Sequence, residues 1–127
     1  MSPHPVRAES ARRTPTTNGV MTTLASPTQG DAQALSMWRA ELKRGARDPC
    51  QIVDSEQIWH VTHGRLAVAI SSSIVELSAG DSLVIPEAVS RNIMAVTDAI
   101  AIVCGFGDAQ VSTPGEPRRA RTPPWIE

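Results

Sequence analysis

The stretch Gly80-Asp81-Ser82-Leu83-Val84-Ile85-Pro86 is a short apolar run closed at both ends by residues that turn the chain. Glycine accepts a positive φ at a tight turn, and proline fixes φ where the chain returns. A run of four residues between two turn signals is typical of a strand rather than a helix. We therefore predict a short strand over 82–85.

Similar runs recur on both sides of this one, again separated by turn residues. Leu66, Val68 and Ile70 repeat with the period of two that a half-buried strand shows, and Ser71-Ser72-Ser73 follows them as a hairpin turn. The other predicted strands cover residues 36–42, 57–63, 65–71, 74–77, 92–96 and 100–106. Many short strands at nearly regular spacing indicate an all-β fold, an antiparallel sandwich or barrel.

The composition divides the 127 residues into three parts. Residues 1–33 are rich in Pro, Thr, Ser, Ala and Arg, which predicts a disordered or loosely ordered N-terminal arm. Residues 34–113 hold most of the Val, Ile and Leu and form the predicted barrel, and residues 114–127 form a polar C-terminal tail. The terminal Trp125-Ile126 pair either packs back on the barrel or stays free.

Charge and cysteine content narrow the possible partners. The net charge is −1, from 12 basic and 13 acidic residues, and the arginine-rich runs lie in the tails, so no nucleic-acid or membrane partner is expected. Cys50 and Cys104 have no metal-binding spacing, and no signal peptide is evident. These features predict a reduced cytoplasmic protein.

A first set of residues fits a spaced motif that begins at a glycine. Gly45 is followed after five residues by Gln51, and Val53 is the next residue but one. Gln57 comes after three further residues and Gly64 after six more. The two glycines are turn formers at the ends of this span.

A second motif follows in the same order along the chain. Pro86 follows Gly80 after five residues, and Ala88, Arg91 and Ala95 occupy the next motif positions. Together the two motifs resemble those of the cupins, over roughly residues 34–107. The resemblance extends to two short stretches that are similar to those of small actinobacterial cupins, Glu56-Gln57-Ile58-Trp59 and Thr122-Pro123-Pro124-Trp125. The resemblance implies a jelly-roll-like β-barrel, also called a double-stranded β-helix.

The resemblance also implies which residues stand where cupins hold a metal with three His and one Glu. Those positions carry Gln51, Val53, Gln57 and Arg91. Valine cannot ligate a metal, glutamine is a weak neutral donor, and arginine repels a divalent ion. We therefore expect no metal and no other cofactor. Shifting the first motif by one residue gives the alternative of a metalloenzyme with atypical ligands, Cys50 and Glu56.

The remaining polar groups suggest a pocket for an organic ligand. Gln51, Gln57 and Arg91 would converge in the barrel and suit a carboxylate, enolate or phenolate. In an enzyme, Arg91 would stabilise negative charge on a carbonyl oxygen. The alternative is that Arg91 pairs with Glu87 or Asp81 at the barrel rim.

Other candidate site residues are two histidines, two tryptophans and a cysteine. His60 and His63 are possible general bases, although either could be a surface side chain. Trp38 and Trp59 either stack a flat ligand or belong to the core. Cys104 shares a face with other apolar residues of its strand, so a buried thiol beside the ligand is favoured over a nucleophile. Val53 is also expected to contact the ligand, because it occupies one of the positions where cupins hold the metal.

Three functions are compatible with these residues. The first is a metal-independent cyclase, isomerase or dehydratase acting on a carbonyl-rich, polyketide-like metabolite. The second is a non-catalytic cupin that binds a small molecule or assists another enzyme, and the third is the metalloenzyme described above. A homodimer that pairs through residues 36–42 is also expected, because cupins often associate through edge strands.

Overall fold

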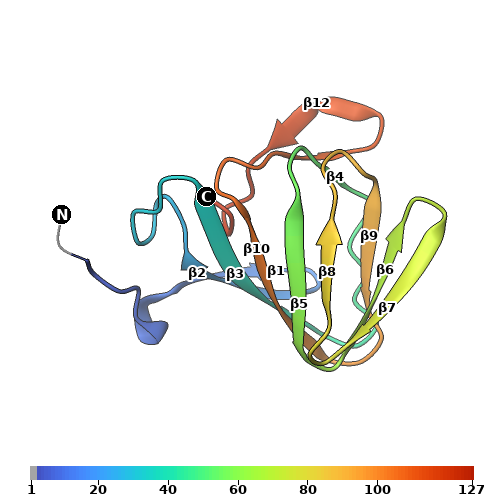
Figure 1. Cartoon of the computed structure of the whole chain (residues 1–127), viewed down its shortest axis with the longest axis horizontal. Coiled ribbons are helices and arrows are strands. Elements are labelled where there is room, and N and C mark those ends of the chain that lie inside the picture. The colour runs from blue at the N-terminus through green and yellow to red at the C-terminus, as the bar shows by residue number, and fades with distance from the viewer. Residues whose placement is uncertain (1–2) are drawn as a thin grey trace.

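A computed structural model describes residues 3–127 as twelve strands and one short 3-10 helix (Figure 1). The elements are η1 (Ala8–Ser10), β1 (Arg12–Thr16), β2 (Gly19–Ala25), β3 (Leu35–Leu42), β4 (Ile52–Val53), β5 (Gln57–His63), β6 (Arg65–Ile70), β7 (Ser73–Ser78), β8 (Ser82–Ile85), β9 (Arg91–Ala95), β10 (Ala99–Phe106), β11 (Val111–Thr113) and β12 (Glu116–Arg121). The prediction of an all-β fold is confirmed. The predicted strands 57–63 and 82–85 coincide with β5 and β8. No helix within residues 3–127 has the length and apolar character needed to cross a membrane.

The strands form two facing layers and a smaller sheet across one end. One layer is the six-stranded antiparallel sheet β1-β2-β3-β10-β5-β8, and the other contains β7-β6-β9. Residues 45–51 extend the second layer because they run antiparallel to β9, with bonds from Gly45 N–H to the Ala95 oxygen and between Gln51 and Arg91. The third sheet, β12-β11-β4, lies across one end of the barrel (Figure 1).

Strand alternation decides which side chains reach the space between the layers. In β5, Gln57, Trp59 and Val61 are buried, whereas Ile58 is exposed and His60 is half-buried. The other strands contribute Leu66, Val68, Ile85, Ile93 and Val103 to the same core. Because successive strand residues point to opposite faces, Gln57 and Trp59 enter the barrel together.

Two turns show how the motif residues build the barrel. Gly64, between β5 and β6, has a φ of 73°, and a Cβ atom there would clash with the backbone oxygen of Asp98. Ala88, which occupies the position of the second motif's internal glycine, has a φ of 60°. The chain therefore keeps the left-handed turn at this position without the glycine that adopts it at least cost.

The N-terminal arm is the main correction to the predicted domain limits. Residues 12–25 form β1 and β2, and Met21, Thr22 and Thr23 of β2 are buried. Composition alone suggested disorder because these residues are few in Val, Ile and Leu. Threonine is nevertheless a good strand former, and Pro15 is tolerated because β1 is an edge strand.

The C-terminal segment also differs from a polar tail. Residues 111–121 form the β11–β12 hairpin, which β4 joins to the barrel. The open question about the terminal pair is resolved, because Ile126 is buried and the Trp125 oxygen accepts a hydrogen bond of 2.8 Å from Thr23 Oγ1. Arg12 also donates to the Pro124 oxygen over 3.0 Å. The two ends of the chain therefore stabilise each other.

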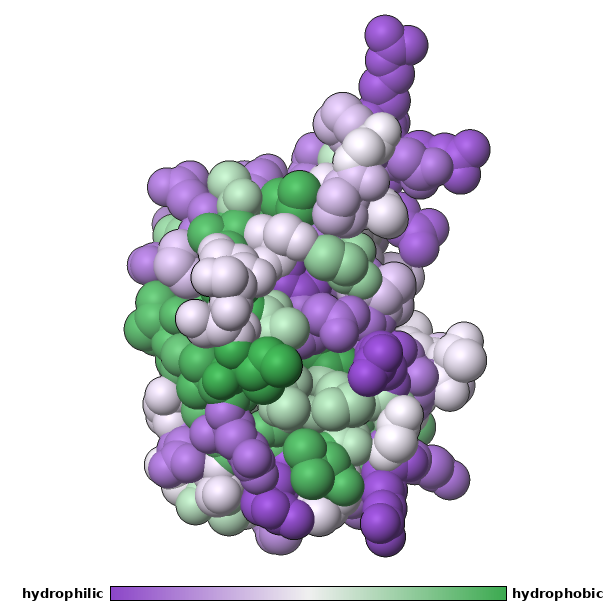
Figure 2. Space-filling view, turned by 90° about the vertical axis from the view of Figure 1, so that its right-hand side faces the viewer, coloured by the Kyte–Doolittle hydropathy of each residue, from purple (hydrophilic) through white to green (hydrophobic). Residues whose placement is uncertain are grey.

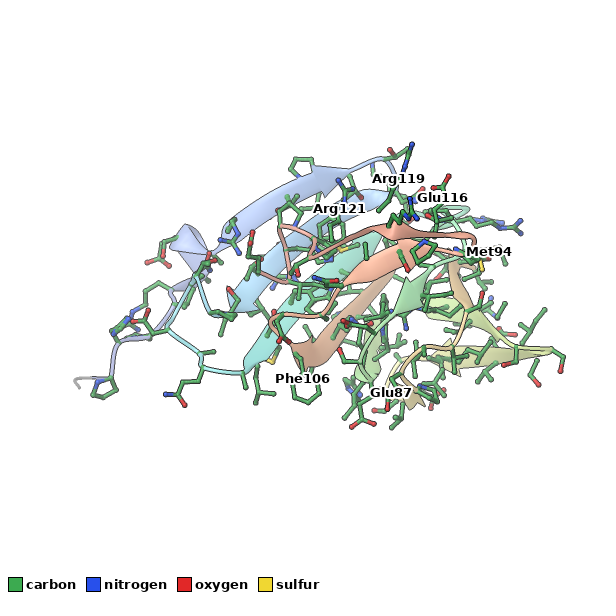
Figure 3. All side chains as sticks on the ribbon, turned by 90° about the horizontal axis from the view of Figure 1, so that it is seen from above. Glu87, Met94, Phe106, Glu116, Arg119 and Arg121 are labelled. Carbon is green, nitrogen blue, oxygen red and sulfur yellow. The ribbon has the colours of Figure 1, made fainter. Side chains whose placement is uncertain are left out.

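Large apolar side chains remain on the surface of both layers. The outer face of the six-stranded sheet exposes Leu35, Met37, Ile58, Val84 and Phe106. Phe106 points to the side opposite the hairpin residues Arg119 and Arg121 (Figure 3). On the view from the side of the second layer, apolar and polar areas alternate (Figure 2), and Ile74 of β7 is 77% exposed.

Candidate functional site

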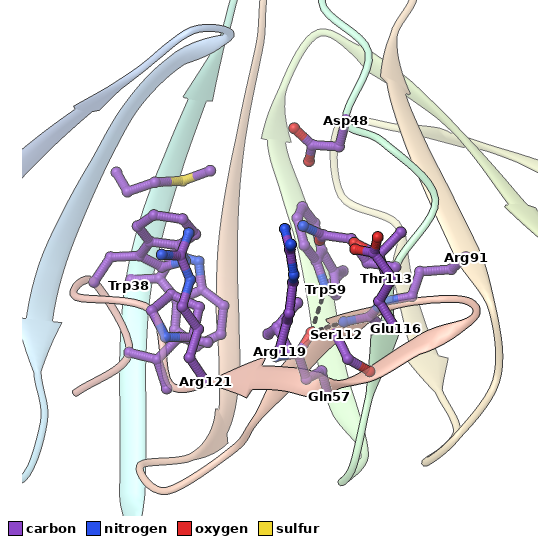
Figure 4. Close-up of a pocket in the computed structure, with 16 residues that line it drawn as sticks. Trp38, Asp48, Gln57, Trp59, Arg91, Ser112, Thr113, Glu116, Arg119 and Arg121 are labelled. Carbon is purple, nitrogen blue, oxygen red and sulfur yellow. Dashed lines mark hydrogen bonds between the residues drawn. The ribbon is translucent and has the colours of Figure 1, made fainter.

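A cavity of about 370 Å³ lies inside the barrel, and the C-terminal hairpin borders it (Figure 4). The barrel layers contribute Trp38, Gln57, Trp59 and Arg91, which are buried side chains. The rest of the lining is Met21, Asp48, Gln51, Val111, Ser112, Thr113, Glu116, Arg119, Arg121, Pro123, Trp125 and Ile126. Side chains from both layers, the hairpin and the C-terminus therefore meet around one space.

The central polar contact of the cavity joins Arg91 and Gln57. Arg91 Nη2 donates to Gln57 Oε1 over 2.7 Å, and Trp59 Nε1 donates to the same oxygen over 3.3 Å. Gln51 lies beside Arg91 because the two residues exchange backbone hydrogen bonds of 2.9 Å. The structure thus brings together Gln51, Gln57 and Arg91. Arg91 bonds to Gln57 rather than pairing with Glu87 or Asp81 at the rim.

Burial and charge oppose each other at Arg91 and Asp48. Desolvation lowers the pKa of Arg91 to about 10, and the Asp48 charge partly opposes that change. Desolvation raises the pKa of Asp48, whereas the Asn18 hydrogen bond (3.0 Å) and the charge of Arg91 lower it. At neutral pH, Arg91 therefore remains a cation in a largely desolvated position, where its interaction with an anion is strong.

The other predicted site residues divide into those that line the cavity and those that do not. Trp38 and Trp59 line it and also belong to the hydrophobic core, so each has both of the positions that the sequence left open. Val53 is a core residue outside the lining. His60 bonds to Ser82 Oγ over 2.7 Å and His63 to Thr62 Oγ1 over 3.0 Å, and neither histidine lines the cavity. Their positions give no support to an acid–base role there.

The expected burial of Cys104 is wrong. Both cysteines are free and exposed, and Cys104 lies on the outer face of β10. The inner face of β10 carries the small residues Ala99, Ala101 and Val103. The larger apolar side chains, which share the face of Cys104, made that face resemble the core. Cys104 therefore does not contact the cavity.

Sequence reasoning missed the charged residues that the loop and the hairpin bring to the cavity. Asp48 lies in the segment that extends the second layer, and Glu116, Arg119 and Arg121 lie on the hairpin. The sequence signal that could have revealed them was the spacing of Arg119 and Arg121, which would place both side chains on one face of a strand. It was weak, because a short polar run at a chain end more often belongs to a solvated tail. Trp125 reaches the cavity by the packing of the C-terminus.

The positions that hold a metal in cupins do not fit a metal ion in this chain. Val53 is an apolar core residue, and Arg91 places a cation beside Gln57, whose side-chain oxygen already accepts two hydrogen bonds. Cys50 bonds to Ser90 Oγ over 2.7 Å, and neither Cys50 nor Glu56 lines the cavity. Within residues 3–127, no group of three His, Cys, Asp or Glu side chains is arranged to hold a metal ion.

Comparison of the sequence with protein-family models and with curated proteins gives no match. Comparison of the fold with solved structures gives many. An RmlC-like cupin from Shewanella frigidimarina is 24% identical with a TM-score of 0.70, covering 83% of this chain and 90% of its own. KdgF from Halomonas sp. is 19% identical with a TM-score of 0.69, covering 81% and 94%.

An enzyme is among the similar structures. A variant of oxalate decarboxylase from Bacillus subtilis is 16% identical with a TM-score of 0.70, and the match covers 77% of this chain but 27% of the larger enzyme. Likenesses at these identities establish the fold and leave the activity open. The chain is therefore a small domain of the cupin fold.

Proposed function

We propose that the protein binds a small, oxygen-rich organic metabolite in its cavity without a metal, and that it acts on a carbonyl-rich intermediate of polyketide type as an isomerase, cyclase or dehydratase. The observation that supports this proposal is the buried guanidinium group of Arg91, which donates a hydrogen bond to the side-chain oxygen of Gln57 in a cavity lined by tryptophans. A desolvated guanidinium held in place by a neutral acceptor keeps its charge available for an oxyanion.

Asp48 supplies the proton acceptor that the histidines do not. It lines the same cavity, and its raised pKa makes the carboxylate a stronger base than an exposed aspartate. In an isomerisation, Asp48 removes a proton from the carbon next to a carbonyl, and the electron pair moves to the oxygen beside Arg91. When the substrate carries a C=C bond β,γ to that carbonyl, the product of this step is a dienolate, and the resulting carboxylic acid returns the proton to its γ carbon, so that the double bond moves into conjugation.

A non-catalytic binding protein is the second candidate. It is favoured because neither His60 nor His63 lines the cavity, so the cavity holds no histidine that could act as a general base, and catalysis would depend on Asp48. Binding at Arg91 needs no proton transfer. Proton exchange separates the two candidates, because a binding protein leaves the carbon acid unchanged.

The test measures exchange of the α-protons of flat cyclic ketones, 1-tetralone and 1-indanone, in D₂O by NMR. We expect the protein to accelerate exchange and Asp48→Asn or Arg91→Gln to slow it by roughly 100-fold. Arg118→Gln, an exposed substitution outside the lining, is the matched control and should exchange like wild type. Exchange at the buffer rate with wild-type protein would replace the enzyme proposal with the binding protein.

A further inference from the structure

The aromatic residues of this chain are concentrated in the cavity. The chain has three tryptophans, one phenylalanine and no tyrosine, and all three tryptophans, Trp38, Trp59 and Trp125, line the same space. Trp38 and Trp59 are 2% and 5% exposed, and Trp125 is half-buried. Flat aromatic walls favour a flat ligand, because stacking gains contact area at little conformational cost.

The C-terminal hairpin adds two guanidinium groups to these walls. Arg119 and Arg121 are two residues apart on β12, so they share the face that is turned toward the cavity (Figure 4). Arg118, on the same strand, does not line the cavity. None of the ion pairs formed within residues 3–127 includes Arg119 or Arg121. The two cations border the cavity with their charge uncompensated by direct pairing.

The charges around the cavity lie in two places. Arg91 lies within the barrel with Asp48 nearby, and Arg119 and Arg121 lie on the hairpin with Glu116. The lining thus has three cations against two carboxylates. Arg91 is bonded to Gln57 inside, so the hairpin arginines form a second and separate binding position for an anion.

We propose that the ligand is a flat, conjugated acid whose carboxylate binds Arg119 and Arg121 while a carbonyl or phenol oxygen at its other end reaches Arg91 and Gln57. This inference rests on the proposed function, because the inner oxygen is the group that Arg91 binds there. The hairpin arginines therefore favour a ligand that carries a carboxylate, and the tryptophans favour one with a flat ring.

Intrinsic tryptophan fluorescence and calorimetry test the ligand class directly, because every tryptophan lines the cavity. The probes are 4-hydroxybenzoate, its methyl ester, which lacks the charge, and 4-hydroxycyclohexanecarboxylate, which lacks the flat ring. We expect 4-hydroxybenzoate to bind and each of the other two to bind about tenfold more weakly or worse. Equal affinities, or no binding of 4-hydroxybenzoate at millimolar concentration, would overturn the proposal.

Matched variants separate this inference from the proposed function. Arg119→Gln and Arg121→Gln should each weaken binding of 4-hydroxybenzoate about tenfold and leave the affinity for the methyl ester unchanged, and Arg118→Gln should change neither. Weaker binding in both the hairpin variants and Arg91→Lys supports both proposals. Weaker binding in Arg91→Lys alone overturns the hairpin assignment and leaves the proposed function standing. Weaker binding in the hairpin variants alone overturns the proposed function, and with it the inner contact on which this inference rests.

Discussion

Arg91 and Gln57 occupy two positions where cupins hold metal ligands, and they bond directly to each other over 2.7 Å. The contact replaces a metal-centred arrangement with a cation and a neutral acceptor. Both side chains are buried, at 6% and 2% exposure, so neither can turn to water if its partner is lost. Loss of either partner therefore leaves a buried polar side chain unpaired.

Removal of one partner of this pair should cost more than removal of both. Gln57→Leu leaves the Arg91 charge without its acceptor, and we expect a loss of about 2–3 kcal/mol in the free energy of unfolding. The double variant with Arg91→Leu should lose less than the sum of the two single variants, because no buried charge remains. Urea denaturation of the four proteins gives the coupling energy. Additive losses would show that the contact contributes little.

Stability should depend on pH through Asp48. Its pKa is raised in the folded state by burial, so the folded protein binds the proton more tightly than the unfolded chain. Folding stability should therefore fall as pH rises from 3.8, the ordinary pKa of an aspartate, through the raised pKa of Asp48 in the folded state, and then level off. In Asp48→Asn this decline should be absent. Thermal unfolding across this range measures it, and parallel curves for the two proteins would contradict the assignment.

Ala88→Gly should stabilise the protein. Ala88 has a φ of 60°, which costs an L-residue about 1–2 kcal/mol, and glycine adopts it freely. The added flexibility of the unfolded chain offsets about 0.4–1 kcal/mol of this gain, which leaves a net gain of about 0.6–1 kcal/mol. Ala79→Gly, at a neighbouring turn whose φ is not positive, should instead lose stability. Denaturation midpoints distinguish the two directions.

Two adjacent threonines should respond differently to the same substitution. Thr23 Oγ1 donates to the Trp125 oxygen over 2.8 Å, so Thr23→Val should cost about 1 kcal/mol and loosen the C-terminal segment. Thr22 is also buried, but its hydroxyl has no hydrogen-bond partner within residues 3–127, so Thr22→Val should be neutral or stabilising. Calorimetry gives both effects, and a red shift of tryptophan emission in Thr23→Val alone would report the loosening.

We propose a homodimer that pairs through the outer face of the six-stranded sheet. β3 lies between β2 and β10 in that sheet, so the expected edge-strand pairing through residues 36–42 is wrong, and these residues take part through their exposed face instead. Met37, Cys104, Ile58 and Val84 lie opposite one another across four neighbouring strands and are all exposed. An apolar row of this kind favours burial against a second copy. Ile58→Glu should shift the mass measured by light scattering toward the monomer, whereas Ile74→Glu, on β7, should not. A monomeric mass for the wild type at micromolar concentration would refute the dimer.

Much of the barrel was predictable because its signals are local. The period of two in Leu66, Val68 and Ile70 and the turn formers around Gly80 act within a few residues. The end segments gave no such signal. β1 and β12 are edge strands with little apolar content, and each pairs with its neighbour in the sequence. The two end segments are joined to the barrel by pairings over longer distances in the sequence, β2 with β3 and β11 with β4.

The sequence by itself determined most strands and turns of the barrel between residues 36 and 106 and the replacement of the metal-ligand positions by Gln51, Val53, Gln57 and Arg91, because these features depend only on local spacing and residue chemistry. Only the tertiary structure decided which of these side chains meet. It bonded Arg91 to Gln57, turned Cys104 and His60 away from the cavity, and brought Asp48 into it. The physical reason is that which face of a strand is buried depends on the layer packed against it, and that layer is formed by distant parts of the chain.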